Sequence, residues 1–173
     1  GCKKNGPTGG GGGGGGGWFV GESGLMVNID PEEAPDDVAS YPLGTDQALE
    51  AIACRHRAEA WVAGASGTLL YTSDGGAEWT TQVLPTTADL HGVATQDHGS
   101  VFLVGDGVFL TAVPDARGNA TWTSLGQDVR YLGVAAAQTE AGAPSTERTK
   151  TVLAIDESGG IWAYADGALV RRS

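Results

Sequence analysis

The fold is decided by the stretch WVAGASGTLLYTSDGGAEW, which runs from Trp61 to Trp79. Two apolar, β-prone runs, 60–64 and 68–72, flank a short turn in which Gly67 supplies the positive φ that tight hairpin turns need. The pattern predicts a β-hairpin. Another β-prone run extends from Trp79 to Leu84, and we expect it to add one more strand beside the hairpin.

The hairpin pattern recurs along the chain, which is typical of a repeat protein. Further copies read WFVGESGLMV from Trp18, FLVGDGVFLT from Phe102 and VLAIDESGGIWAY from Val152. In chain order, a short apolar run precedes the second, third and fourth hairpins. These runs begin 41 residues apart, at Leu49, Leu90 and Tyr131. Each unit therefore holds four short strands in about 41 residues, the length of a propeller blade.

The predicted fold class is all-β: a β-propeller-type repeat of four-stranded blades, about four in number, forming a small ring or a partial propeller. The repeat domain covers residues 18–173 and follows a flexible tether, residues 1–17, that contains nine consecutive glycines. The first unit has no first strand, and its last strand is expected at 38–43. The other strands are predicted at 18–21, 24–30, 49–54, 60–64, 68–72, 79–84, 90–95, 101–105, 108–112, 121–125, 131–136, 151–155 and 160–165.

The end of the second hairpin resembles an Asp-box, a turn motif of the form S/T-x-D-x-G-x-T-W. Its residues here are Thr72, Asp74, Gly76 and Trp79, and Glu78 replaces the usual threonine. In such a motif the aspartate caps backbone N–H groups, the glycine adopts a conformation barred to other residues, and the tryptophan packs between blades. We therefore expect a structural role for these residues. A looser version follows one repeat later, with Thr111, Asp115, Gly118, Thr121 and Trp122.

With the preceding hairpin, this motif makes the chain similar to bacterial Asp-box (BNR-repeat) propellers. Among these it most resembles the photosystem II assembly-factor type and its non-photosynthetic bacterial relatives. The resemblance covers 18–173 as a blade pattern and is specific over about 60–85. It implies a propeller fold and a protein-binding or assembly role outside the cytoplasm.

The number of repeat units bears on whether the propeller closes into a ring. Removing 17 tether residues from 173 leaves 156, or about 3.8 units of 41. An open arc would leave apolar blade faces in water, beyond what monomers usually tolerate. A single-chain ring, with Ala168–Arg172 beside Trp18, is slightly favoured because the net charge of −11 opposes self-association. The alternatives are two chains paired end to end or completion by a partner, so the chain is expected to be a monomer or a homodimer.

The sequence points away from catalysis. The acidic charge disfavours nucleic acid and anionic membrane surfaces as partners. Sialidases also carry Asp-boxes, but no arginine here stands in the arginine-isoleucine-proline context of those enzymes. The three histidines, His56, His91 and His98, form no metal-binding motif. We therefore expect no enzyme activity, no cofactor and no metal.

Three functions remain open. The first is a non-catalytic, exported protein-binding or assembly module. The second is a carbohydrate- or cell-wall-binding module, in which aromatic rings stack on sugars. The third is a subunit of a larger envelope assembly that completes its propeller with another chain. Exposure of the five tryptophans separates the second from the others, because tryptophans packed between blades provide no platform for a sugar. They are Trp18, Trp61, Trp79, Trp122 and Trp162.

The N-terminus suggests how the domain is held. Gly1-Cys2 resembles the end of a bacterial lipobox after removal of the signal peptide, so Cys2 is the candidate lipidation residue and the glycine tract is a tether. The protein would then be extracytoplasmic, as an outer-membrane lipoprotein or in the periplasm, and would touch membranes only through this anchor. A cloning remnant and a disulfide with Cys54 are the alternatives.

Substitution Cys2→Ser tests the anchor. When the protein is expressed with a native signal peptide, we expect the variant to move from the membrane fraction to the soluble fraction, because lipid chains attached at one residue account for binding. Immunoblotting of the separated fractions measures this. Equal membrane retention of the variant and the parent would exclude lipidation at Cys2.

Overall fold

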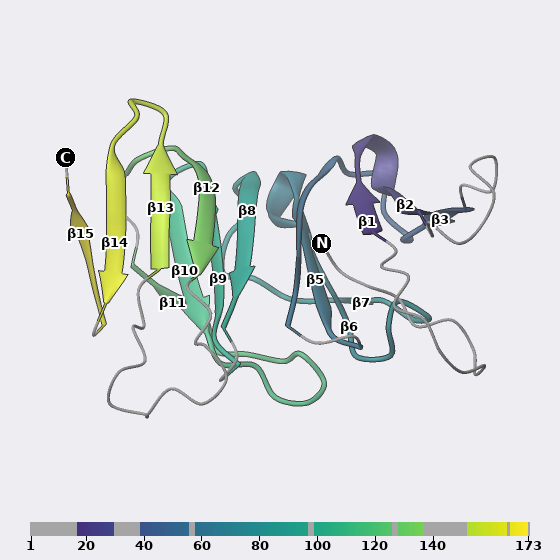
Figure 1. The fold of residues 1–173 in the computed structure, drawn as a ribbon. Helices are drawn as coiled ribbons and strands as arrows, with labels where there is room; N and C mark the ends of the chain where they lie inside the picture. Colours follow the sequence, from purple (N-terminus) through teal and green to yellow (C-terminus); the bar gives the residue numbers. More distant parts are fainter. Residues whose placement is uncertain are drawn as a thin grey trace.

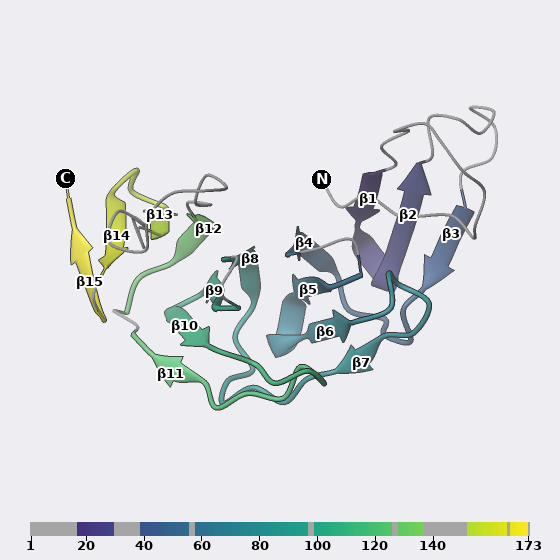
Figure 2. The same cartoon turned by 60° about the horizontal axis from the view of Figure 1, so that its bottom comes forward.

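The structure is a computed structural model, and it describes residues 17–29, 39–55, 58–96, 99–125, 128–136, 152–165 and 167–172. Over these residues the chain forms four antiparallel sheets that follow one another in an open arc (Figures 1 and 2). We call the sheets blades 1 to 4. Blade 1 has three strands, and each of the others has four.

The strands run in chain order within each blade. Blade 1 contains β1 (Gly17–Val20), β2 (Leu25–Ile29) and β3 (Ala39–Pro42); blade 2 contains β4 (Leu49–Cys54), β5 (Ala60–Gly64), β6 (Leu69–Thr72) and β7 (Thr80–Thr81); blade 3 contains β8 (Leu90–Thr95), β9 (Val101–Gly105), β10 (Val108–Ala112) and β11 (Thr123–Ser124); blade 4 contains β12 (Tyr131–Ala136), β13 (Val152–Asp156), β14 (Ile161–Ala165) and β15 (Ala168–Arg171). The first strands β4, β8 and β12 line the concave side of the arc (Figure 2). Two single 3-10 turns, Glu22–Gly24 and Ala65–Gly67, close hairpins.

The core consists of three apolar layers, one between each pair of neighbouring blades. Between blades 2 and 3, Trp61 and Leu69 pack against Leu90 and Leu103, and all four side chains are fully buried. Corresponding layers join blade 1 to blade 2 and blade 3 to blade 4. Because successive residues of a strand project to opposite faces, a strand buried on both sides must be apolar throughout. This accounts for fully buried strands such as β5 and β9.

A backbone hydrogen bond is repeated at each blade junction. The glycine of each hairpin turn donates its N–H to the carbonyl that lies two residues before the next blade's first strand. The pairs are Gly24 to Gln47 (2.8 Å), Gly67 to Ala88 (2.9 Å) and Gly107 to Val129 (3.1 Å). The φ angles of these glycines are +66°, +68° and +69°. A Cβ atom on Gly67 would lie only 2.5 Å from the carbonyl oxygen of Thr86, so the turn requires glycine both for its conformation and for space.

The predicted strands are found, and six of them have the predicted bounds: 49–54, 60–64, 90–95, 101–105, 108–112 and 131–136. The outer strands β7 and β11 are two residues long, whereas the sequence predicted 79–84 and 121–125. Both are edge strands with exposed side chains, and short edges are common because they limit pairing with other chains. Strand β15 was predicted only as a C-terminal packing segment.

The preferred ring closure was wrong. Strand β15, which contains most of the Ala168–Arg172 run, lies at the opposite end of the arc from Trp18 (Figure 2). Trp18 packs instead into the layer between blades 1 and 2. A four-bladed ring needs a quarter of a full turn at each junction, and the curvature of this arc does not bring blade 4 back to blade 1. The described chain is the other predicted form, a partial propeller.

The role of the turn glycines is tested by Gly67→Ala. We expect it to lower the free energy of unfolding by about 3 kcal/mol, because the methyl group meets the Thr86 carbonyl in addition to the strain of positive φ. Gly44→Ala is the matched control: its φ is +72° and nothing lies within 4 Å, so it should cost only about 1 kcal/mol. Urea denaturation measures both, and equal losses would contradict the clash.

Candidate functional site

A β-bulge interrupts each inner strand at its second residue. The register against the neighbouring strand shifts between Leu49 and Ala51 in β4, and the same shift recurs in β8 and β12. The bulged residues are Glu50, His91 and Leu132, at matching repeat positions. Bulges redirect side chains and are common beside functional sites. They therefore place one such side chain on the inner strand of each of blades 2, 3 and 4.

The bulged residues of blades 2 and 3 meet in a charged group that we call the inner-strand cluster: Glu50, His91, Asp106 and Arg130. His91 Nδ1 lies 2.6 Å from Glu50 Oε2, and His91 Nε2 lies 2.9 Å from Asp106 Oδ1. The same Asp106 oxygen accepts a hydrogen bond of 2.8 Å from Arg130 Nε. Because Arg130 precedes β12, the cluster joins blades 2, 3 and 4.

Hydrogen bonding sets the charge state of the cluster. The His91 side chain is only 11% exposed, and this burial lowers its pKa, but the bonds to Glu50 and Asp106 raise the pKa more, so the net shift is upward. The His91 bond, together with Arg130, lowers the pKa of Asp106. Glu50, Asp106 and Arg130 remain exposed. The cluster therefore offers carboxylates and a guanidinium to a partner on one surface.

The four residues of the Asp-box-like segment come together in one turn. Thr72 Oγ1 donates to Asp74 Oδ1 (2.7 Å) and accepts from the Gly76 N–H (3.0 Å). Asp74 also accepts the N–H groups of Ala77 and Glu78, and the Thr72 hydroxyl and these bonds lower the pKa of Asp74. Trp79 packs in the layer between blades 1 and 2. The arrangement can hold a turn, and that role stays a prediction.

Two further aspartates make comparable bonds. Asp115 accepts the N–H groups of Arg117 and Asn119 in the looser version of the motif. Buried Asp156 accepts bonds from Ser158, from the Gly160 N–H and from Trp162 Nε1, and the bonds from the Ser158 hydroxyl and Trp162 hold its pKa far below the usual range. The sequence signal for Asp156 was its place before the Ser158-Gly159-Gly160 turn.

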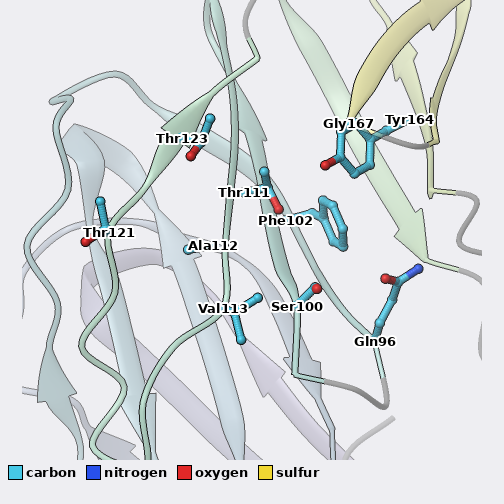
Figure 3. Close-up of a pocket in the computed structure, with 10 residues that line it drawn as sticks. All are labelled: Gln96, Ser100, Phe102, Thr111, Ala112, Val113, Thr121, Thr123, Tyr164 and Gly167. Carbon is cyan, nitrogen blue, oxygen red and sulfur yellow. The ribbon is translucent and has the colours of Figure 1, made fainter.

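A groove of about 530 Å³ lies between blades 3 and 4 (Figure 3). The rings of Phe102 and Tyr164 stand 5.4 Å apart beside it. The rest of its described lining is neutral: Gln96, Ser100, Thr111, Ala112, Val113, Thr121, Thr123 and Gly167. Among the described residues, this lining contains no carboxylate, imidazole or amine.

The tryptophans provide no stacking platform. Trp18, Trp61 and Trp162 are buried, and Trp79 and Trp122 are half-buried against the layers between blades. Trp122 meets Trp61 edge-to-face across the blade 2–3 junction, with ring centroids 6.4 Å apart. Sugar-binding faces need exposed rings, so the arrangement counts against the carbohydrate-binding hypothesis.

Within the described residues, no group of three or more His, Cys, Asp or Glu side chains could hold a metal ion. None of the described helices is long and apolar enough to cross a membrane. Cys2, the candidate lipidation residue, and the tether up to residue 16 lie outside the described residues, as do His56 and His98. Cys54 is half-buried at the end of β4.

The inner-strand cluster was not predicted from the sequence. There His91 was considered only as one of three histidines that form no metal-binding motif, and Glu50, Asp106 and Arg130 were given no role. A signal was present, because Glu50 and His91 stand 41 residues apart at the same position of the repeat. Equivalent positions in adjacent blades are neighbours in space.

Repeated antiparallel blades with bulged inner strands define a β-propeller-type protein. No protein-family profile matches the chain. Over 109 residues it is 32% identical to the photosystem II assembly lipoprotein Ycf48 of Trichormus variabilis and to that of a Nostoc species. Each match covers 60% of this chain and 32% of the relative, so the chain spans about a third of the length of these curated relatives.

A solved structure described as YCF48 bound to D1 peptide has the same fold. It superposes with a TM-score of 0.56 at 18% identity, and the match covers 73% of this chain and 40% of the solved chain. The two chains therefore share the arrangement of their blades, although their sequences are only 18% identical.

The charge of His91 gives a pH-dependent prediction. A raised pKa in the folded state means that protonated His91 stabilises the fold fully below about pH 6.5, and that this contribution is lost as the pH rises through the folded-state pKa. His91→Gln lacks this titration. The stability difference between parent and variant should therefore be larger at pH 5.5 than at pH 9, measured by urea denaturation. A difference that is constant with pH would contradict the cluster.

Proposed function

We propose that this chain is a non-catalytic protein-binding module of the Ycf48 type that acts in the assembly of a complex outside the cytoplasm. The observation that carries the proposal is the inner-strand cluster, which brings charged side chains from three blades onto one surface while leaving three of them exposed.

The chemistry of the cluster fits a protein ligand. Arg130 uses Nε on Asp106, so its remaining donors can reach a partner's carboxylate or backbone carbonyl. Glu50 and Asp106 can accept N–H groups or a basic side chain. The names of the relatives support this choice: two are assembly lipoproteins, and the solved YCF48 is described with a bound D1 peptide.

The same geometry disfavours catalysis. Both ring nitrogens of His91 are bonded to carboxylates, so neither is available as a general base. No Ser, Thr or Cys hydroxyl or thiol bonds to His91 among the described contacts, so the arrangement lacks the pairing of nucleophile and base.

Anchoring at the membrane belongs to the same proposal. Cys2 is the proposed lipid attachment residue, and the glycine tract is the proposed tether of an extracytoplasmic, outer-membrane or periplasmic protein. The relatives' description as lipoproteins supports it.

A displayed library of linear peptides tests the proposal. We expect the parent chain to enrich a peptide family, and Arg130→Glu to weaken binding of the selected peptide at least tenfold by calorimetry, because arginine is enriched among the residues that dominate binding energy at interfaces. Arg117→Glu is the matched control, since Arg117 is an exposed arginine outside the cluster. It should bind like the parent.

A glycan array run in parallel provides the opposing outcome. Binding to glycans without any enriched peptide would overturn the proposed function in favour of a carbohydrate-binding module. Equal losses in Arg130→Glu and Arg117→Glu would remove the cluster from the binding site.

A further inference from the structure

A tyrosine ring fills part of the junction between blades 2 and 3. Tyr71 of β6 is 4% exposed and packs on Trp61, with ring centroids 4.5 Å apart. Its hydroxyl donates a hydrogen bond to the backbone carbonyl of Ala116 (3.5 Å). A Cβ atom on Gly118 would lie 2.4 Å from the Tyr71 ring, so the loop between β10 and β11 lies directly on the ring. The ring is therefore held between a tryptophan and the backbone of the next blade's loop.

The junction between blades 3 and 4 is built differently at the same place. Thr111 pairs with Phe102 in blade 3 as Tyr71 pairs with Trp61 in blade 2, so a threonine occupies the position of the tyrosine. Residues 113–122 link β10 to β11, whereas residues 166–167 alone link β14 to β15. Among the described residues, neither the Tyr71 ring nor the loop that covers it has a counterpart at this later junction.

The groove of about 530 Å³ lies at this corresponding place (Figure 3). Phe102 and Thr111 both line it, and Thr123, which pairs with Thr111 on its other side, continues the same row of side chains across blade 3. Tyr164 of blade 4 leans on Phe102 and forms the opposite wall, where its ring stays half-buried. The groove thus joins an aromatic wall to a row of hydroxyl groups.

A buried amide in the groove has unused bonding capacity. Gln96, which directly follows β8, is 3% exposed and lines the groove. Its backbone groups bond to Ser100 and Gly99, but its side-chain amide makes no hydrogen bond within the described part of the chain. A buried amide without a partner costs free energy. The amide of Gln96 can accept a proton from a hydroxyl through Oε1 or donate one through Nε2.

The equivalent of Gln96 in blade 2 lies near the hydroxyl of Tyr71. Arg55 follows β4 as Gln96 follows β8. Burial raises the pKa of Tyr71, and the charge of Arg55 is close enough to oppose this shift. A ring placed beside Thr111 as Tyr71 is placed in blade 2 would therefore direct its hydroxyl towards the Gln96 side of the groove.

We propose that this groove binds a tyrosine side chain presented by a partner polypeptide. The bound ring packs against Tyr164 beside Thr111, and its hydroxyl bonds to the amide of Gln96. Thr121 and Thr123 are exposed along the groove, so their hydroxyls can bond the peptide groups on either side of the tyrosine.

This site goes beyond the proposed function, because it is separate from the inner-strand cluster. Gln96 and Ser100 of the groove lie before β9 begins, whereas Asp106 of the cluster follows the end of β9. The two sites therefore lie at opposite ends of the strands of blade 3, and each can be tested without disturbing the other.

NMR titration of the full chain with N-acetyl-L-tyrosinamide tests the proposal. We expect saturable shifts of the backbone amide signals of Gln96, Thr111, Thr123 and Gly167, with a Kd on the order of millimolar because the probe is small. N-acetyl-L-leucinamide keeps the peptide groups without the aromatic ring and should bind at least tenfold more weakly. p-Cresol keeps the ring without the peptide groups and should bind at least threefold more weakly.

Substitution Thr111→Tyr fills the groove from within, because it supplies the ring that blade 2 has at this position. It should weaken binding of the probe at least tenfold. Thr81→Tyr is the matched control: Thr81 is exposed on β7, outside the groove, so this variant gains the same ring and should bind like the parent. Gln96→Met removes the amide at nearly constant volume and should weaken binding at least threefold.

Three results would overturn the proposal. They are the absence of saturable shifts in the groove, unchanged binding by a folded Thr111→Tyr variant, and binding of p-cresol or methyl glucoside as tight as that of the probe, which would make the groove a site for small phenols or sugars. Far-UV circular dichroism reports folding. If Thr111→Tyr does not fold, unchanged binding by Gln96→Met overturns the proposal instead. Arg130→Glu should bind the probe like the parent, which separates this site from the proposed function.

Discussion

The central strands of the described blades carry apolar side chains on both faces, so a blade is stable only when neighbours cover it. Fully buried strands such as β5 and β9 have no polar side to turn towards water. The three layers between blades meet this constraint inside the arc. At the two ends it is unmet, which is why large apolar side chains such as Phe19 and Ile155 are exposed there.

Close blade packing also dictates the turn chemistry. The hairpin turn of one blade lies against the chain leading into the next, close enough for a direct N–H to carbonyl bond at each junction. At Gly24 the space is smaller still than at Gly67, with a Cβ position only 1.7 Å from the Thr45 carbonyl oxygen. Glycine recurs at these turns because both the reversal of the chain and the close approach of the neighbouring blade require it.

Strand positions followed from the sequence because local patterning determines them. Apolar runs and turn glycines bound β4, β5, β8, β9, β10 and β12 correctly. Ring closure did not follow, because it depends on the angle between packed sheets, which no short motif encodes. The Asp-box-like residues could be placed together from spacing alone. The inner-strand cluster could not, since Asp106 and Arg130 lie outside the strands, and the contacts of Glu50 with His91 and of Arg130 with Asp106 form only across blade junctions.

The bulges link blade packing to the geometry of the candidate site. An extra residue in β4 and in β8 takes Glu50 and His91 out of the alternating pattern of side chains along these strands. The packing of blade 2 against blade 3 then sets the distance between the two side chains. His91 bridges blades 2 and 3, and Asp106 continues the chain of bonds to Arg130 before blade 4. The geometry of the cluster is therefore a property of the arc's curvature.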